Sequence, residues 1–145
     1  MQQKIWKIIL ILPTIAALIL EMLPYGAVLN FAVQQESGSV ETVRVLTSYF
    51  DPLNFGYANF GPMLTALLTC ALFLCGGALF FSDRASMPVA VLSVFACAAS
   101  LSPLLYGIDH YSGIGAAISV LLGVEIILAF VYRRFYSEKA RERYL

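Results

Sequence analysis

Hydrophobic residues gather in four long runs, and polar residues are confined to the stretches between the runs and at both ends. The runs extend over about 8–33, 59–81, 88–107 and 113–132. Each is long enough to cross a bilayer as a helix, for which about 20 apolar residues suffice at about 1.5 Å each. None alternates polar and apolar positions as a membrane β-strand does. The pattern predicts an all-α integral membrane protein, a bundle of four transmembrane helices forming a single membrane domain over 1–145.

One sizeable polar connection, about 34–57, separates the first two runs, whereas the other connections, 82–87 and 108–112, are short. Within it, residues 40–45 are rich in β-branched side chains in partial alternation, which favours a short strand or hairpin lying on the membrane surface. The end of the loop is dense in aromatic residues, a composition typical of the headgroup region. These aromatics are Tyr49, Phe50, Phe55, Tyr57 and Phe60.

The overall composition agrees with a membrane location. Of the 145 residues, 60% are hydrophobic and only 12% are charged, against roughly 25% charged residues in a typical soluble domain. This composition excludes a water-soluble globule. The formal net charge is zero and no basic stripe is interleaved with aromatics, so no nucleic-acid partner is expected.

The positions of Lys and Arg predict the orientation of the bundle. Eight of the nine fall on the side of the two termini, and only Arg44 falls on the other side. Because cytoplasmic segments carry the excess of basic residues, both termini are expected in the cytoplasm and the loop 34–57 outside. The basic tail, 133–145, is expected to continue the fourth helix, either along anionic headgroups or as a solvated end. We expect a cell membrane location, in the cytoplasmic membrane of a bacterium, since no Asn-x-Ser/Thr site and no outer cysteine occurs.

Two carboxylates, Glu21 and Glu125, lie deep within the first and fourth runs, where no Lys or Arg is available to pair with them. A charge in lipid is costly, so each acid needs a reason. Their depths differ by about 9 Å along the helices, so they are not expected to share a proton within one chain. Two interpretations remain open. Each acid couples protons or cations to transport, or a neutral carboxyl joins helices by hydrogen bonding to a hydroxyl or carbonyl.

Helical spacing places Glu21 on one face with Thr14, Ala17 and Tyr25, and this face is expected to point into the bundle. Glu125 is expected to face either a second neighbour in the bundle or a partner subunit. Thr14, Glu21, Tyr25 and Glu125 are therefore the candidate proton, ion or polar-core sites. A polar group at the outer end could extend an entry path toward Glu21. Its members are Tyr106, Asp109, His110 and Tyr111.

Small residues at four-residue spacing mark the expected helix contacts, because close backbone approach drives helix association in lipid. The two stripes are Gly115, Ser119 and Gly123 in the fourth run, and Gly61, Thr65 and Thr69 in the second. Pro24 is expected to kink the first helix and to leave the Leu20 carbonyl without its usual partner.

No motif indicates catalysis. Cys70, Cys75 and Cys97 lack metal-ligand spacing, and no paired acids, nucleophile–base arrangement or phosphate-binding loop occurs, so no enzyme activity, metal or cofactor is expected. We expect an accessory or structural subunit that engages other membrane components, either further copies of itself or another membrane protein, through its outer loop and small-residue seams. The alternative is a small oligomeric proton- or cation-coupled transporter using Glu21 and also Glu125.

Four spans with a glutamate in the first are similar in outline to the small multidrug resistance transporters. The long loop 34–57 and the tail beginning at Arg133 depart from that pattern. The resemblance is confined to Glu21 and the number of spans, so family membership is not inferred.

Overall fold

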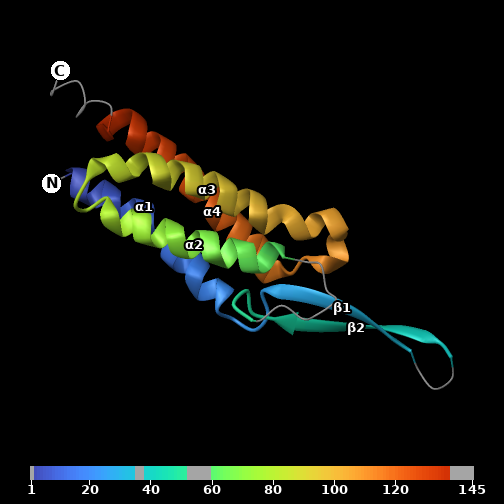
Figure 1. Ribbon diagram of the computed structural model, residues 1–145. Helices are drawn as coiled ribbons and strands as arrows, with labels where there is room; N and C mark the ends of the chain where they lie inside the picture. Colours follow the sequence, from blue (N-terminus) through green and yellow to red (C-terminus); the bar gives the residue numbers. More distant parts are fainter. Residues whose placement is uncertain (1, 35–37, 52–59, 138–145) are drawn as a thin grey trace.

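A computed structural model describes residues 2–34, 38–51 and 60–137. It contains four main helices, α1 (Gln2–Glu21), α2 (Gly61–Ala78), α3 (Ser86–Leu101) and α4 (Gly113–Tyr132), which lie side by side (Figure 1). Counting α3 with the 3₁₀ turns at its two ends, and α4 with its continuation to Tyr136, all four helices are long and apolar enough to cross a membrane. The predicted four-helix membrane architecture is confirmed at this level.

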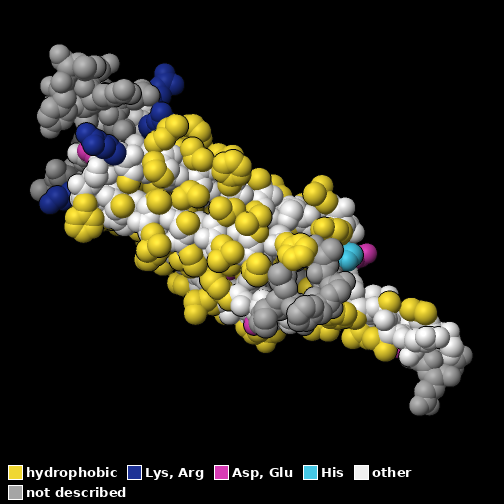
Figure 2. Space-filling view, in the orientation of Figure 1, with side chains coloured by type: hydrophobic (Ala, Val, Ile, Leu, Met, Phe, Trp, Pro, Cys, Tyr) yellow, Lys and Arg dark blue, Asp and Glu magenta, His cyan; other side chains and the backbone are white. Residues whose placement is uncertain are grey.

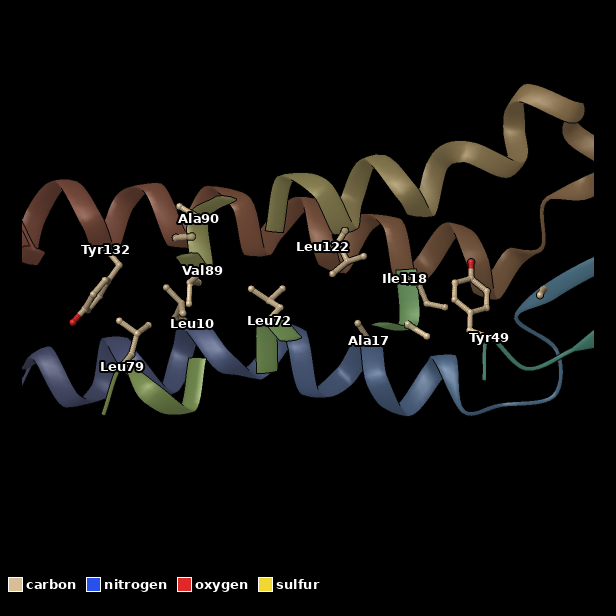
Figure 3. Close-up of a cluster of buried hydrophobic side chains, with 14 residues drawn as sticks. Leu10, Ala17, Tyr49, Leu72, Leu79, Val89, Ala90, Ile118, Leu122 and Tyr132 are labelled. Atoms are coloured by element: carbon tan, nitrogen blue, oxygen red, sulfur yellow. The ribbon is translucent and has the colours of Figure 1, made fainter. Parts of the chain in front are cut away.

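The helices pack in a ring, with α1 against α2 and α4, and α3 against α2 and α4. Buried side chains recur three or four residues apart, which places them on one face of each helix. Leu10, Leu72, Ile118 and Leu122 fill the centre of the bundle (Figure 3). The outward faces are apolar as well, and Lys and Arg gather at the end that holds the termini (Figure 2). A protein with an apolar interior and an apolar exterior is suited to lipid.

The first predicted span is wrong at its C-terminal half, because α1 ends at Glu21 instead of continuing to residue 33. Residues beyond the turn form strand β1 (Ala27–Gln34), which pairs antiparallel with β2 (Val40–Thr47). Pro24 lacks a backbone N–H and disfavours helix at the residue before it, so the helix stops where a kink was expected. The all-α prediction therefore omits a two-stranded sheet, and a strand in the loop was expected only over 40–45.

The hairpin β1–β2 follows α1 in the chain. It extends away from the end opposite the termini, roughly in the direction of the helices (Figure 1). Its base is fixed by an isolated bridge between Ala27 and Tyr111 and by a hydrogen bond from the Asn30 side-chain amide to the Asp109 carbonyl, at 3.5 Å. The remainder of the predicted loop, 52–59, and the end of the tail, 138–145, lie outside the described residues.

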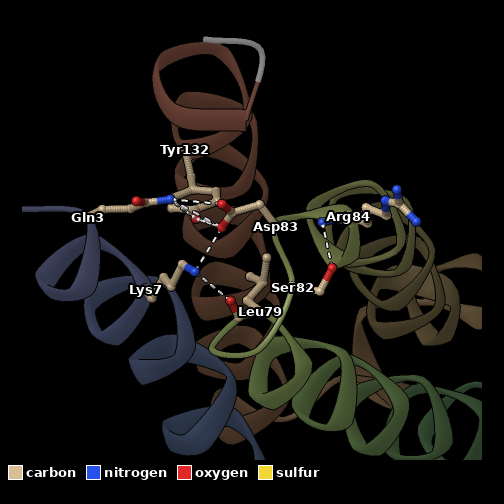
Figure 4. A network of polar contacts seen from close by, with 7 residues as sticks. All are labelled: Gln3, Lys7, Leu79, Ser82, Asp83, Arg84 and Tyr132. Atoms are coloured by element: carbon tan, nitrogen blue, oxygen red, sulfur yellow. Dashed lines mark hydrogen bonds and ion pairs between the residues drawn. The ribbon is translucent and has the colours of Figure 1, made fainter. Parts of the chain in front are cut away.

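The end of the bundle that holds the termini is joined by a polar cluster around Asp83, in the short turn between α2 and α3 (Figure 4). Lys7 of α1 forms an ion pair with Asp83 at 2.8 Å and donates to the Leu79 carbonyl at 2.6 Å. Gln3 donates to both Asp83 oxygens, and the Tyr132 hydroxyl of α4 donates to Asp83 Oδ1 at 2.9 Å. One carboxylate thus connects α1, α4 and the α2–α3 turn.

Replacing Asp83 by Ala is expected to lower the thermal stability of the detergent-solubilised protein. The change removes the acceptor shared by Lys7, Gln3 and Tyr132, and we expect a loss of about 1–2 kcal/mol because the cluster is partly exposed. Thermal unfolding followed by circular dichroism measures it. The neighbouring exposed Arg84 is the matched control, and an Arg84→Ala variant as destabilised as Asp83→Ala would contradict the role given to this cluster.

Candidate functional site

Glu21 is the last residue of α1, and its side chain is fully buried. Its Oε1 lies 2.8 Å from the Thr69 hydroxyl of α2. Thr69 also bonds the Thr65 carbonyl at 2.9 Å, and Thr65 donates to the Gly61 carbonyl at 2.8 Å. The four-residue spacing predicted as a packing stripe therefore forms a row of hydroxyl–carbonyl bonds that ends on Glu21. Among the described residues, Glu21 Oε2 has no hydrogen-bond partner.

The backbone carbonyl of Glu21 is capped by the chain that follows β2. The Tyr49 N–H and the Ser48 hydroxyl both donate to this carbonyl, each at 3.0 Å. Asp51 Oδ2 in turn accepts from the Ser48 N–H at 2.7 Å, which fixes the turn. A helix end leaves carbonyls without intrahelical partners, and here the base of the hairpin supplies one set of donors. Glu21 thus contacts α2 through its side chain and the hairpin through its backbone.

Tyr49 closes the bundle above Glu21. The sequence placed this ring among the interfacial aromatics, but it is only 2% exposed and points into the bundle near Ile118 (Figure 3). Gly26 and Gly115 leave the room for it, because a Cβ on either would lie within 3.0–3.2 Å of the Tyr49 side chain. Burial, together with Tyr111 and Glu21 nearby, raises the pKa of the Tyr49 phenol. The phenol therefore stays neutral over the physiological pH range.

Glu125, on α4, is also buried, and Thr14 of α1 hydrogen-bonds its carboxyl through both side chain and backbone. This contact places Glu125 against a neighbouring helix of the same bundle, one of the two alternatives left open by the sequence. Glu125 Oε2 has no partner among the described residues. Thr14 and Glu125, two candidate site residues that the sequence did not pair, are therefore in contact.

A signal for that pairing exists in the sequence. Thr14 lies seven residues after Lys7, and Glu125 lies eight residues before Arg133. Both therefore lie about 11–12 Å from the same membrane edge, at about 1.5 Å per residue. Depth matching of polar residues, applied across helices, predicts the contact.

A third set of polar contacts joins α3 to α4. The Ser119 hydroxyl lies 2.8 Å from the Ser100 hydroxyl of α3 and is also bonded by the Tyr111 hydroxyl. Of the expected entry group, Tyr111 thus reaches inward, while His110 packs against the ring of Tyr106. Ser100 and the Ser48–Tyr49 turn were not singled out from the sequence, because only the tertiary arrangement brings them to the interior.

The remaining candidates differ in their surroundings. Tyr25 is 56% exposed and lies outside the polar interior, since α1 ends before it and the expected helical face does not continue. Gly61 lies against Ser102 and Ala99 of α3, so close that a Cβ would overlap the Ser102 hydroxyl. Gly115 is in contact with the Tyr49 hydroxyl, whereas Gly123 has open space around it.

One face of the hairpin is almost wholly apolar, whereas the other mixes polar and apolar side chains. Residues directly opposite each other in an antiparallel pair share a face, so the register Leu29–Val45, Phe31–Val43 and Val33–Glu41 defines an apolar face with one acid near its tip. The opposite face carries the polar Asn30, Arg44 and Thr42, together with Val28, Ala32, Val40 and Leu46, of which Val40 and Leu46 are 67% and 42% exposed. On the apolar face Val33, Val43 and Val45 are 47%, 41% and 38% exposed.

The interior chemistry is that of hydroxyls and carboxyls in hydrogen-bonding contact, which can hold helices or bind a proton. Within the described ranges, no three His, Cys, Asp or Glu side chains gather as metal ligands would. Cys70, Cys75 and Cys97 are free thiols.

Together, four helices that are long and apolar enough to cross a membrane, with one two-stranded hairpin, define a mostly helical protein whose composition suits a membrane. Comparison with family models, with curated proteins and with solved structures found no match to the chain.

Proposed function

We propose that this protein is an accessory or structural membrane subunit that binds another membrane protein through the apolar face of its hairpin. The observation that carries the proposal is the exposure of Val33, Val43 and Val45 on a hairpin that extends beyond the bundle. An isolated two-stranded hairpin is marginally stable in water, and contiguous exposed apolar patches mark interaction sites. A partner that covers this face stabilises both.

The hairpin is held so as to present this face. Its two strands are attached to the bundle at separate points, by Ala27 to Tyr111 and by Ser48 and Tyr49 to Glu21. Attachment at both strands limits the motion of the base, which lowers the entropic cost of ordering an interface. This favours a docking element over a free loop.

Charge favours a different protein over a second copy as the occupant. Copies inserted in the same orientation are related by rotation about the membrane normal, so facing hairpins would meet at the same height. Such an arrangement would bring Glu41 of one copy opposite Glu41 of the other, and like charges directly opposite are destabilising. We therefore propose a different protein with an apolar surface as the partner.

The proposal includes the orientation and the site of action. Lys and Arg side chains gather at the end of the bundle that holds the termini (Figure 2), which supports a cytoplasmic position for that end and an outward position for the hairpin. Gly123, with open space around it, offers a second place for a neighbouring helix to approach. A bacterial cytoplasmic membrane remains the proposed location.

Aspartate substitutions at Phe31 and Val43 are expected to abolish partner binding, because they place charge in the centre of the apolar face. The measurement is purification from native membranes in mild detergent, followed by mass spectrometry of what co-purifies. Thr42→Asp, one residue away on the opposite face, is the matched control and is expected to retain the partner. Retention of the same partner by the Phe31→Asp/Val43→Asp variant would overturn the proposal.

A second candidate, proton- or cation-coupled transport, is favoured by the unpartnered oxygens of the buried Glu21 and Glu125. Intramembrane carboxyls are typical of proton relays. Proton flux into liposomes containing the purified protein, if abolished by Glu21→Gln without loss of folding, would support transport over the accessory role. An absence of flux in the wild type would remove this candidate.

A further inference from the structure

We propose that Glu21 is a proton-binding site of the bundle, and that loss of its proton releases the base of the hairpin. The same residue bonds α2 with its carboxyl and the Ser48–Tyr49 turn with its carbonyl. Proton binding and hairpin attachment therefore meet at one residue. The inference concerns the isolated protein and needs neither a partner nor transport.

The hydrogen bonds around Glu21 suit the protonated acid. Thr69 has one hydroxyl hydrogen but lies within bonding distance of two acceptors, Glu21 Oε1 and the Thr65 carbonyl. A protonated Glu21 can donate to Thr69, which then donates to Thr65, so that both contacts are satisfied at once. An ionised Glu21 would hold its charge with one hydroxyl donor and with Oε2 unpartnered, which is costly in a fully buried position.

Among the residues that the structure describes, no charged group near Glu21 compensates for its ionisation. The titratable side chains that face it are Cys70 from α2 and Tyr49 from the turn after β2, both neutral when protonated. Tyr111, from the α3–α4 connection, lies near Tyr49. On α4, the buried acid is Glu125. It bonds Thr14 of α1, which lies seven residues before Glu21 in the chain. Apart from the Thr69 hydroxyl, the ionised carboxyl can therefore be stabilised only by water.

Water reaches Glu21 when Tyr49 moves. The Tyr49 ring fills the space between Gly26 and Gly115 at the end of α1, and its N–H is bonded to the carbonyl of Glu21 itself. Hydration of the carboxylate thus favours a state in which the Ser48–Tyr49 turn has detached and the proton has passed to the entering water. By linkage, a low pH holds the hairpin in place and a high pH releases it.

The test is amide hydrogen exchange of the hairpin, measured by mass spectrometry on the purified protein across pH, with each variant compared with wild type at the same pH. Comparison at equal pH removes the chemical pH dependence of exchange. We expect strands β1 and β2 of wild type to exchange at least about tenfold faster than those of Glu21→Gln at high pH, and equally fast at low pH. The amide cannot ionise, so it keeps the turn attached.

Glu125→Gln is the matched control, because it removes an equally buried carboxyl that has no bond to the hairpin, and it is expected to exchange as wild type does. Thr69→Val keeps the shape but removes both the acceptor used by protonated Glu21 and the one described donor to ionised Glu21. Because the charge-assisted bond to the ionised acid is the stronger of the two, the variant is expected to move the midpoint of the transition to higher pH. This variant carries the test if Glu21→Gln does not fold. Equal exchange of wild type and Glu21→Gln at every pH, or an unmoved midpoint in Thr69→Val, would overturn the inference.

Discussion

Substituting Gly61 by Leu is expected to prevent the bundle from forming. Gly61 begins α2 at the point where this helix meets the end of α3, and a Cβ there would overlap the Ser102 hydroxyl and approach the Ala99 carbonyl to 3.3 Å. Ser102 itself bonds the Ala99 carbonyl at 2.7 Å, so it cannot turn away without losing that bond. Because the remaining Leu atoms would meet backbone, we expect a loss of at least about 3 kcal/mol. Size-exclusion chromatography and thermal unfolding in detergent measure it.

Gly77 provides the control for this prediction. It lies on the same helix, but a Cβ there meets nothing within 4 Å. Gly77→Leu is therefore expected to fold as wild type, since the new side chain lies against detergent or lipid. The smaller substitution Gly61→Ala tests the same clash, because its Cβ also overlaps the Ser102 hydroxyl. Adding Ser102→Ala removes this atom and should restore part of the stability that Gly61→Ala loses. A Gly77→Leu variant as unstable as Gly61→Leu would contradict this prediction, because it would show that the close contact at Gly61 does not decide the outcome.

The sequence predicts those features that depend on hydropathy along a helix. The fourth span was expected over 113–132, and α4 has these bounds, because Ser112 caps its first turn and its apolar run ends at Arg133. The burial of Thr14, Ala17 and Glu21 on one face follows from helical spacing alone. These properties are local, so one sequence is sufficient to state them.

Other features depend on contacts between distant parts of the chain. Residues 28–33 are as apolar as the helix before them, and hydropathy does not distinguish a strand from a helix in so short a run. Pro24 ends the helix before these residues, and the bonds from Ser48 and Tyr49 to Glu21 hold the hairpin that they form. Ser48 is 27 residues away from Glu21 in the chain. Tyr49 resembles an interfacial aromatic by composition, and only the space beside Gly26 and Gly115 places it inside.

The buried Glu125 leads to the second large expected effect. Replacing Thr14 by Val removes the hydroxyl that bonds the Glu125 carboxyl, while the shape of the side chain is retained. The bond from the Thr14 backbone remains, so the carboxyl loses one of its two bonds, and a buried polar group that loses a hydrogen bond costs about 1–3 kcal/mol. We therefore expect Thr14→Val to lower the unfolding free energy by about this amount, measured by reversible unfolding in mixed detergent. Ile15→Val, at the next position on a more exposed part of α1, is expected to change little.

The pair can then be tested as a unit. Replacing both partners by apolar groups removes the unsatisfied carboxyl along with its donor, so Thr14→Val/Glu125→Leu is expected to be more stable than Thr14→Val alone. The double-mutant cycle should give a coupling of about 0.5–3 kcal/mol, as found for residues in direct contact. A coupling near zero would mean that Thr14 does not satisfy Glu125. In that case the acid would be held in the bundle for a reason other than joining α1 to α4, and the transport alternative would gain support.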